Sequence, residues 1–157
     1  MKTYYKAKVK NWNELPKDEQ WVYGYYVQGF NIYEEPLHII FDPTTIFYSS
    51  GETDGWEEID VNTLCACTVL TDKIGNKIWE NDILFDDDMY SVVRWDDEEA
   101  RFVIDDYGTK GCLMEYGFDE DAGDYDVVDT NGFDDFCSMD SFKIVGNIFD
   151  NPELLQK

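Results

Sequence analysis

The sequence predicts a mainly β fold, a small barrel or sandwich, for this chain of 157 residues. Aromatic residues make up 17% of the chain and only four residues are proline, a bias that favours strands over helices. Hydrophobic residues make up 43%, which is enough to build a core and argues against wholesale disorder. Short apolar runs recur roughly every eight to twelve residues with turn residues between them, as in small barrels and sandwiches.

The first part of the chain, residues 1–62, is predicted to be an N-terminal β-rich segment. Alternation in "WVYGYYVQGFNIY" predicts an aromatic strand that begins at Trp21, with Gly29 able to turn or bulge it. The runs "LHIIF" and "TTIFYSS" predict two more short strands, separated by the turn signal Asp42-Pro43. "SSGETDG" is expected to be a loop.

The second part, residues 63–157, is predicted to be an acidic, barrel-like region, and the two parts could also form one compact unit. It opens with "TVLTDKIGNKIWENDILF", in which Asp72 to Asn76 forms a turn and Gly75-Asn76 suits positive φ. "YSVVRW" and "RFVIDDY" then predict a hairpin joined by Asp96 to Ala100.

The end of the chain, "FKIVGNIFDNPELL", predicts one more strand and a short terminal helix. Ile144 belongs to the strand, and Gly146-Asn147 forms a turn or bulge. Asn151 suits an N-cap, and Pro152 suits the first turn of the helix.

The charge of the chain is unusual, because it has 35 acidic residues and only 12 Lys and Arg residues, which gives a net charge of −23. Residues 86–135 alone hold 18 acidic and three basic residues. Such a surface repels nucleic acid and anionic membranes and attracts cations and basic protein surfaces. Direct binding of DNA or RNA is not expected, since that binding depends on neutralising phosphates with Lys and Arg.

The cysteines and the N-terminus predict a cytoplasmic protein with reduced thiols. The four cysteines are Cys65, Cys67, Cys112 and Cys137. The close pair is C-A-C with no histidine near it, so zinc ligation has little support and small buried side chains are expected. The N-terminus lacks an apolar signal region, and no run approaches the ~18 apolar residues of a membrane span.

No catalytic signature is present, and we expect neither an enzyme nor a cofactor. The single histidine, His38, lies in an apolar run, and no nucleophile elbow, P-loop or dinucleotide fingerprint occurs. Counting an EF-hand loop from Asp119 puts Gly123 at position 5 and Thr130 at position 12, so the register fails. No metal site is predicted, although weak binding of divalent cations by the acidic loops stays open as an alternative.

Three segments resemble the YopX family of phage proteins: "WVYGYYV", "LTDKIGNKIWENDIL" and "IVGNIFDNPELL". They follow one another in the family's order from about Trp21 to Leu155. The resemblance implies a phage or prophage origin in a bacterial host, an SH3-like barrel and homo-oligomer formation. It implies no activity. The acidic stretch between the two later motifs departs from the family pattern.

The two later motifs also have a structural interpretation of their own. The turn at Gly75 and Asn76 leads to Ile78, Ile83 and Leu84, which are expected to enter the core. Asp82 is expected to accept a hydrogen bond from a backbone turn. Turn chemistry and burial thus account for the motif without catalysis.

The acidic residues are predicted to form an exposed partner-binding surface. On a strand, every second residue shares a face at ~6.6–6.8 Å, close to the same-strand phosphate spacing of DNA. If those segments are extended, Asp97 would project with Glu99, Asp119 with Asp121, and Asp124 with Asp126. The full set of predicted contact residues is Asp86, Asp87, Asp88, Asp96, Asp97, Glu98, Glu99, Asp105, Asp106, Asp119, Glu120, Asp121, Asp124 and Asp126.

Two functional classes remain open on the sequence. The first is a nucleic-acid mimic that inhibits a basic nucleic-acid-binding protein of the bacterial host, for example a CRISPR effector nuclease. The second is an oligomeric accessory or structural phage protein whose acidity has no specific target.

Overall fold

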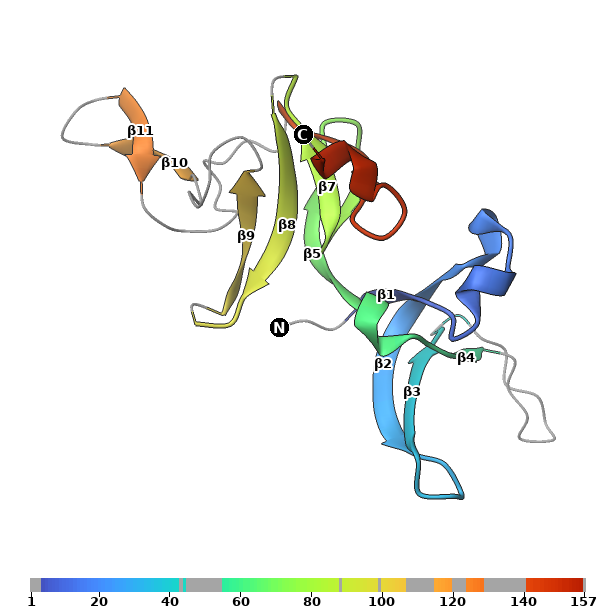
Figure 1. Ribbon diagram of the computed structural model, residues 1–157. Helices are drawn as coiled ribbons and strands as arrows, with labels where there is room; N and C mark the ends of the chain where they lie inside the picture. Colours follow the sequence, from blue (N-terminus) through green and yellow to red (C-terminus); the bar gives the residue numbers. More distant parts are fainter. Residues whose placement is uncertain are drawn as a thin grey trace. The chain divides into compact units, whose positions relative to one another are not determined.

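The computed structural model describes residues 4–42, 44, 55–87, 89–98, 100–106, 115–119, 124–128 and 141–156 (Figure 1). The chain divides into two compact units, residues 1–67 and residues 68–157. The sequence had suggested a boundary between residues 62 and 63. Each unit is described by itself. Within the described residues, no helix is long and apolar enough to cross a membrane.

Unit 1 is built on an antiparallel sheet in the order β4-β3-β2-β1 (Figure 1). Its strands are β1 (Tyr5–Lys8), β2 (Trp21–Phe30), β3 (Pro36–Phe41) and β4 (Trp56–Glu58). Its short 3-10 helices are η1 (Trp12–Glu14), η2 (Lys17–Glu19) and η3 (Val61–Thr63). The strands predicted at "WVYGYYV" and "LHIIF" are confirmed. The one predicted at "TTIFYSS" lies outside the described residues, apart from Thr44.

The core of unit 1 lies on one face of this sheet. Ala7, Ile40 and Ile59 are at most 4% exposed. Partly buried hydrophobic side chains pack against them, namely Tyr5, Val22, Tyr26 and Leu64. Strand alternation places Ala7 and Val22, which are register partners, on this face. The period-2 pattern of the sequence therefore becomes a core on one side of β1 and β2.

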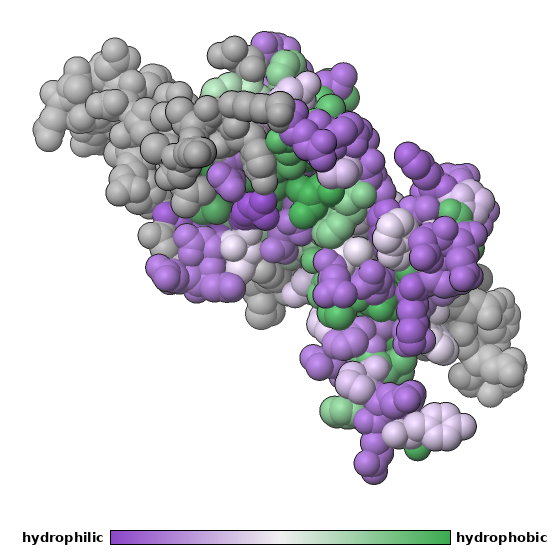
Figure 2. Space-filling model, viewed as in Figure 1, coloured by the Kyte–Doolittle hydropathy of each residue, from purple (hydrophilic) through white to green (hydrophobic). Residues whose placement is uncertain are grey.

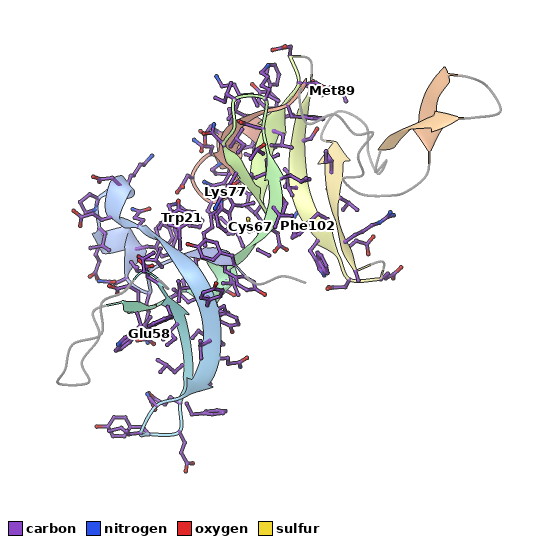
Figure 3. All side chains as sticks on the ribbon, turned by 180° about the vertical axis from the view of Figure 1, so that it is seen from behind. Trp21, Glu58, Cys67, Lys77, Met89 and Phe102 are labelled. Atoms are coloured by element: carbon purple, nitrogen blue, oxygen red, sulfur yellow. The ribbon has the colours of Figure 1, made fainter. Side chains whose placement is uncertain are left out.

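Lys8 is buried in unit 1, although lysine is almost never buried unless its charge has partners. Its ammonium donates a hydrogen bond to Gln20 Oε1 at 3.0 Å and lies 3.9 Å from the centroid of the Trp12 ring. Trp21, labelled in Figure 3, lies 5.5 Å away on β2. A cation over an aromatic face is stabilised by the ring quadrupole, so these aromatic residues offset the cost of burying the charge.

Unit 2 contains a four-stranded antiparallel sheet in the order β12-β7-β8-β9, and a separate hairpin of β10 and β11 (Figure 1). Strand β5 (Cys65–Thr71) pairs with β1 through its first two residues and continues into unit 2, where β6 is its neighbour. The other elements are β6 (Lys77–Trp79), β7 (Asp82–Phe85), β8 (Tyr90–Asp96), β9 (Arg101–Asp106), β10 (Glu115–Asp119), β11 (Asp124–Val128), β12 (Lys143–Asn147) and the 3-10 helix η5 (Pro152–Leu155).

The core of unit 2 includes residues that the motif "KIGNKIWENDIL" was expected to supply. Ile78, Ile83 and Leu84 are all fully buried. Leu84 and Ile78 cluster with Val93, and partly buried side chains surround them, namely Leu70, Phe102, Ile104, Phe142 and Ile144. Phe102, labelled in Figure 3 on β9, also makes an edge-to-face contact with Trp95 at 4.9 Å between ring centroids.

Several turn predictions in unit 2 are confirmed, and the C-terminal helix is confirmed only as a short 3-10 turn. Strands β8 and β9 form the predicted hairpin, and the register of β12 shifts between Ile144 and Gly146, as a bulge requires. Asn151 occupies the predicted N-cap position of this 3-10 helix and Pro152 its first turn, but the Asn151 side chain makes no capping hydrogen bond. That side chain lies against Gly146 instead, where an added Cβ would come within 2.4 Å of Asn151 Oδ1.

The expected SH3-like barrel is not confirmed. The described strands form open antiparallel sheets, and none of these sheets closes on itself. The mainly β class, which rests on aromatic content and alternation, is confirmed.

Gly75 provides a local test of the turn between β5 and β6. Its φ is +89°, and no atom lies within 4 Å of an added Cβ, so the backbone conformation alone selects glycine. We expect Gly75→Ala to lower the free energy of unfolding by about 1 kcal/mol, and Gly75→Asn by less, since Asn tolerates positive φ better. Urea unfolding followed by tryptophan fluorescence measures both; equal losses would show that φ is not the cause.

Candidate partner-binding surface

The predicted acidic residues fall into three groups in the structure. Four of them lie outside the described residues: Asp88, Glu99, Glu120 and Asp121. Four lie in strands described at the level of the backbone: Asp106, Asp119, Asp124 and Asp126. The other six are Asp86, Asp87, Asp96, Asp97, Glu98 and Asp105, and the structure describes them in full.

Asp86 and Asp87 lie in the turn between β7 and β8. Asp86 Oδ1 accepts a hydrogen bond from the Met89 amide at 2.8 Å, so this carboxylate closes the turn. Asp87 has a φ of +78°, and its side chain is 82% exposed and 3.6 Å from the Lys73 ammonium. An ion pair this exposed contributes little to stability. Asp87 is thus the more available of the two for a partner.

The turn between β8 and β9 carries two exposed acids, Asp97 and Glu98. Asp96 Oδ1 accepts a hydrogen bond from the Glu98 amide at 2.8 Å and fixes the turn. Asp97 lies in the turn rather than in a strand, so the alternation expected to pair it with Glu99 does not apply there.

Asp105 has a partner within its own hairpin. Arg94 Nε on β8 lies 3.3 Å from Asp105 Oδ2 on β9, and both side chains are about two-thirds covered. Val92 is the register partner of Asp105, so the Arg94 contact runs diagonally across the two strands. This carboxylate therefore offers less free charge than the turn acids.

The structure describes the β10–β11 hairpin by its backbone register. Asp119 is the register partner of Asp124, and Gly117 is the partner of Asp126. Glu115, at the start of β10, is the partner of Val128. The register therefore pairs two of the predicted acidic positions, Asp119 and Asp124, with one another.

The register of this hairpin adds a pairing that the sequence had not suggested, that of Asp119 with Asp124. The predicted pairing of Asp119 with Asp121 stays a prediction, because Asp121 lies outside the described residues. Asp124 and Asp126 lie two residues apart in the strand β11, the extended segment that their predicted pairing required.

The part of the chain that the structure describes offers few residues for metal binding or acid–base chemistry. There, no group of three or more His, Cys, Asp or Glu side chains could hold a metal ion. His38 lies in β3, and its Nδ1 is 2.7 Å from the Tyr26 hydroxyl, with the two rings stacked. Burial and the nearby Tyr5 raise the pKa of Tyr26, which keeps its hydroxyl protonated.

Asp72 holds the turn of one motif against the strand of the other. Its Oδ1 accepts the amides of Ile74 at 3.1 Å and Asn76 at 2.8 Å. Its Oδ2 accepts the Ile144 amide on β12 at 3.1 Å and the Asn76 side-chain amide at 3.3 Å. Burial raises the pKa of Asp72, but these four hydrogen bonds to its charged form outweigh that effect and lower the pKa overall.

A second connection joins the two motifs near Asn81, whose φ is +67°. The Asn81 amide donates to the Val93 carbonyl at 2.7 Å, and its carbonyl accepts from the Ile148 amide at 3.0 Å. Asp82 accepts the Trp79 amide at 2.8 Å, so the backbone hydrogen bond predicted for it is confirmed. The motif residues thus stabilise the strands of unit 2, and the exposed acids of the predicted surface lie in the turns between those strands.

A search of curated proteins finds no match to the chain. The family model described as "YopX protein" matches residues 16–156, which covers most of both units. The chain therefore belongs to the YopX family.

Proposed function

We propose that this protein is a non-enzymatic, phage-encoded inhibitor that mimics nucleic acid and occupies the binding groove of a basic host defence protein. A CRISPR effector nuclease is one example of such a partner. The net charge of −23 supports the proposal, because it would draw the chain toward a cationic groove.

The observation that carries the proposal is the backbone register of the β10–β11 hairpin. It pairs Asp119 with Asp124, and Asp126 follows two residues further along β11. Like charges at directly opposite positions disfavour a strand pair, and a cationic partner relieves such repulsion, so this register favours binding to a basic protein. Residues two apart on a strand lie ~6.6–6.8 Å from one another, a spacing that suits a groove built for a phosphate row.

The exposed acids in the turn of the β8–β9 hairpin provide a second set of candidate contacts for a basic partner. Asp97 and Glu98 are exposed and do not fix the turn through their side chains, whereas Asp96 does. Charge reversal at Asp97 and Glu98 therefore changes the surface and leaves the hydrogen bond of the turn in place.

The test is a pull-down from bacterial host lysate with the full chain, washed with rising salt. We expect a basic nucleic-acid-binding protein that elutes as salt rises and is displaced by duplex DNA. The variant Asp97→Lys/Glu98→Lys, combined with Asp124→Lys/Asp126→Lys, should capture roughly tenfold less of it, because steering and charge complementarity are lost.

A charge-matched control separates this surface from net charge alone. Asp18 and Glu19 in η2 are exposed acids of unit 1. Reversing both to Lys changes the total charge as much as reversing Asp97 and Glu98 alone does. Equal loss of capture by these two double variants would mean that total charge acts without a defined face. Undiminished capture by the fourfold variant would exclude mimicry through the β8–β9 turn and β11.

A further inference from the structure

The end of the β2–β3 hairpin in unit 1 exposes three large hydrophobic side chains. Phe30 is 71% exposed, Ile32 is 89% exposed and Tyr33 is 76% exposed. Figure 2 shows hydrophobic atoms among hydrophilic ones at this end of the hairpin. Ile32 is the most exposed of the large hydrophobic residues that the structure describes. Single exposed apolar residues are ordinary, but three within four positions at the end of one hairpin offer a partner several apolar contacts at once.

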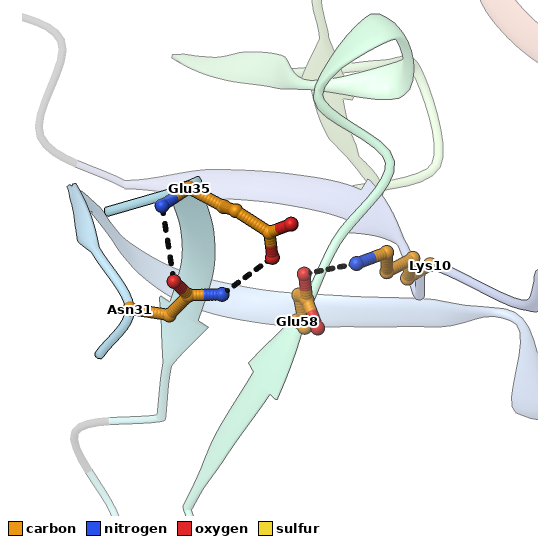
Figure 4. Close-up of polar contacts among 4 residues, drawn as sticks. All are labelled: Lys10, Asn31, Glu35 and Glu58. Carbon is orange, nitrogen blue, oxygen red and sulfur yellow. Dashed lines mark hydrogen bonds and ion pairs between the residues drawn. The ribbon is translucent and has the colours of Figure 1, made fainter. Parts of the chain in front are cut away.

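This loop, residues 31–35, is held in one conformation by Asn31 (Figure 4). The Asn31 Oδ1 accepts the amides of Tyr33 at 2.9 Å and Glu35 at 3.0 Å, and its Nδ2 donates to Glu35 Oε2 at 2.9 Å. Two backbone hydrogen bonds of 3.0 Å close the same loop, from the Asn31 amide to the Glu35 carbonyl and from the Glu34 amide to the Asn31 carbonyl. A loop fixed before binding loses little conformational entropy on binding, which is the basis of preorganised recognition.

Charge restricts what can cover this loop. Glu34 and Glu35 follow the apolar residues directly and are exposed. A second copy of the chain would bring another net charge of −23, and an anionic lipid surface would repel the loop in the same way. A protein pocket with an apolar floor and a rim of Arg or Lys fits both the hydrophobic side chains and the two carboxylates.

We propose that Phe30 and the loop of residues 31–35 form a docking anchor that inserts Phe30, Ile32 and Tyr33 into an apolar, basic-rimmed pocket of a protein partner. The inference goes beyond the nucleic-acid mimicry proposed above, since it concerns an apolar contact made by unit 1. Its salt dependence also differs. Apolar anchoring persists when salt screens surface charges, whereas contacts through exposed carboxylates weaken.

The test places a photoreactive benzoylphenylalanine at Tyr33 of the full chain and irradiates it in bacterial extract at about 1 M salt, where the screening length is about 3 Å. We expect one adduct with another protein, mapped by mass spectrometry to apolar residues bordered by Arg or Lys. Adding Ile32→Ser should reduce its yield at least roughly tenfold. With the identified partner, Ile32→Ser in the otherwise unchanged chain should raise the dissociation constant about thirtyfold, which is the effect expected when a hot-spot side chain is truncated.

The matched control is Ile74→Ser, the same substitution at an isoleucine of unit 2. Ile74 lies in the turn before β6 and is 65% exposed. It should leave the yield unchanged, and circular dichroism should show all variants folded. The anchor is refuted if the adduct joins two copies of the chain, if it forms only with lipid, if none forms, or if Ile32→Ser and Ile74→Ser act alike. None of these outcomes depends on the acids of unit 2, so the anchor and the mimicry fail separately.

Discussion

Replacing Asp72 by Asn should lower the free energy of unfolding of unit 2 by about 3 kcal/mol, one of the two largest effects that we expect from a single substitution. Asp72 is 5% exposed and its two carboxylate oxygens accept four hydrogen bonds. In Asn one oxygen becomes an NH2 group. On the Oδ2 side this group would face the Ile144 amide, so two donors would oppose each other and a buried amide would lose its acceptor.

The loss should depend on pH in a defined direction. The pKa of Asp72 is about 3.8 in the unfolded chain and is lower in the folded state. The contribution of Asp72 to stability is therefore fully present above the unfolded-state pKa and is lost as the pH falls through the folded-state pKa. The difference in unfolding free energy between the wild type and Asp72→Asn should therefore be constant near neutral pH and narrow below about pH 3.8. Comparing the two proteins removes the effect of acid on the self-repulsion of the other carboxylates.

Urea titrations of both proteins between neutral pH and pH 3 provide the measurement. Asp18→Asn serves as the control, because it removes one negative charge from an exposed position in η2. Its effect should stay within about 0.5 kcal/mol, as for surface substitutions in general. A loss for Asp72→Asn of the same small size would show that the bridge between the two motifs contributes no stability.

The second large effect is expected from Gly24→Ala, which should lower the free energy of unfolding of unit 1 by about 3 kcal/mol. An added Cβ would lie 2.1 Å from the Phe41 carbonyl oxygen and 2.7 Å from its carbonyl carbon. These are backbone atoms of β3 and cannot rotate away, so the strand itself would have to move. The Ile40 side chain, which belongs to the core, is 3.0 Å from the same position.

Gly29 supplies the matched control for this substitution within the same strand. No atom lies within 4 Å of a Cβ built on Gly29, so Gly29→Ala should change stability by less than about 0.5 kcal/mol. Thermal unfolding followed by near-ultraviolet circular dichroism, which detects the aromatic residues of β2, distinguishes the two variants. Similar melting temperatures for both would contradict the close approach of β3 to Gly24.

Local features of the fold could be predicted because each depends on residues close together in the chain. The aromatic alternation after Trp21 gave β2, and Gly75 gave a turn with positive φ. Asp96 to Ala100 gave the turn of the β8–β9 hairpin. Side-chain alternation and turn chemistry act within a few residues, so a single sequence contains the information.

Features that depend on distant residues could not be predicted in the same way. Gly24 reads as an ordinary strand glycine until β3 is placed next to it. Asn151 occupies the N-cap position that was predicted for it, but its side chain lies against Gly146 and makes no capping hydrogen bond. The spacing of short apolar runs left a barrel and a sandwich open, and the SH3-like barrel was implied by the family; the described strands do not close into a barrel.

The candidate surface shows the same division. The sequence by itself determined the excess of acid, its concentration in residues 86–135, and the membership in the YopX family. Only the tertiary structure decided which acidic side chains already have hydrogen-bond or ion-pair partners within the protein. Asp86 and Asp96 close turns, Asp105 pairs with Arg94, and Asp97 stays exposed. Composition fixes the total charge, but the availability of each carboxylate depends on the amides and cations that the fold brings within hydrogen-bonding distance.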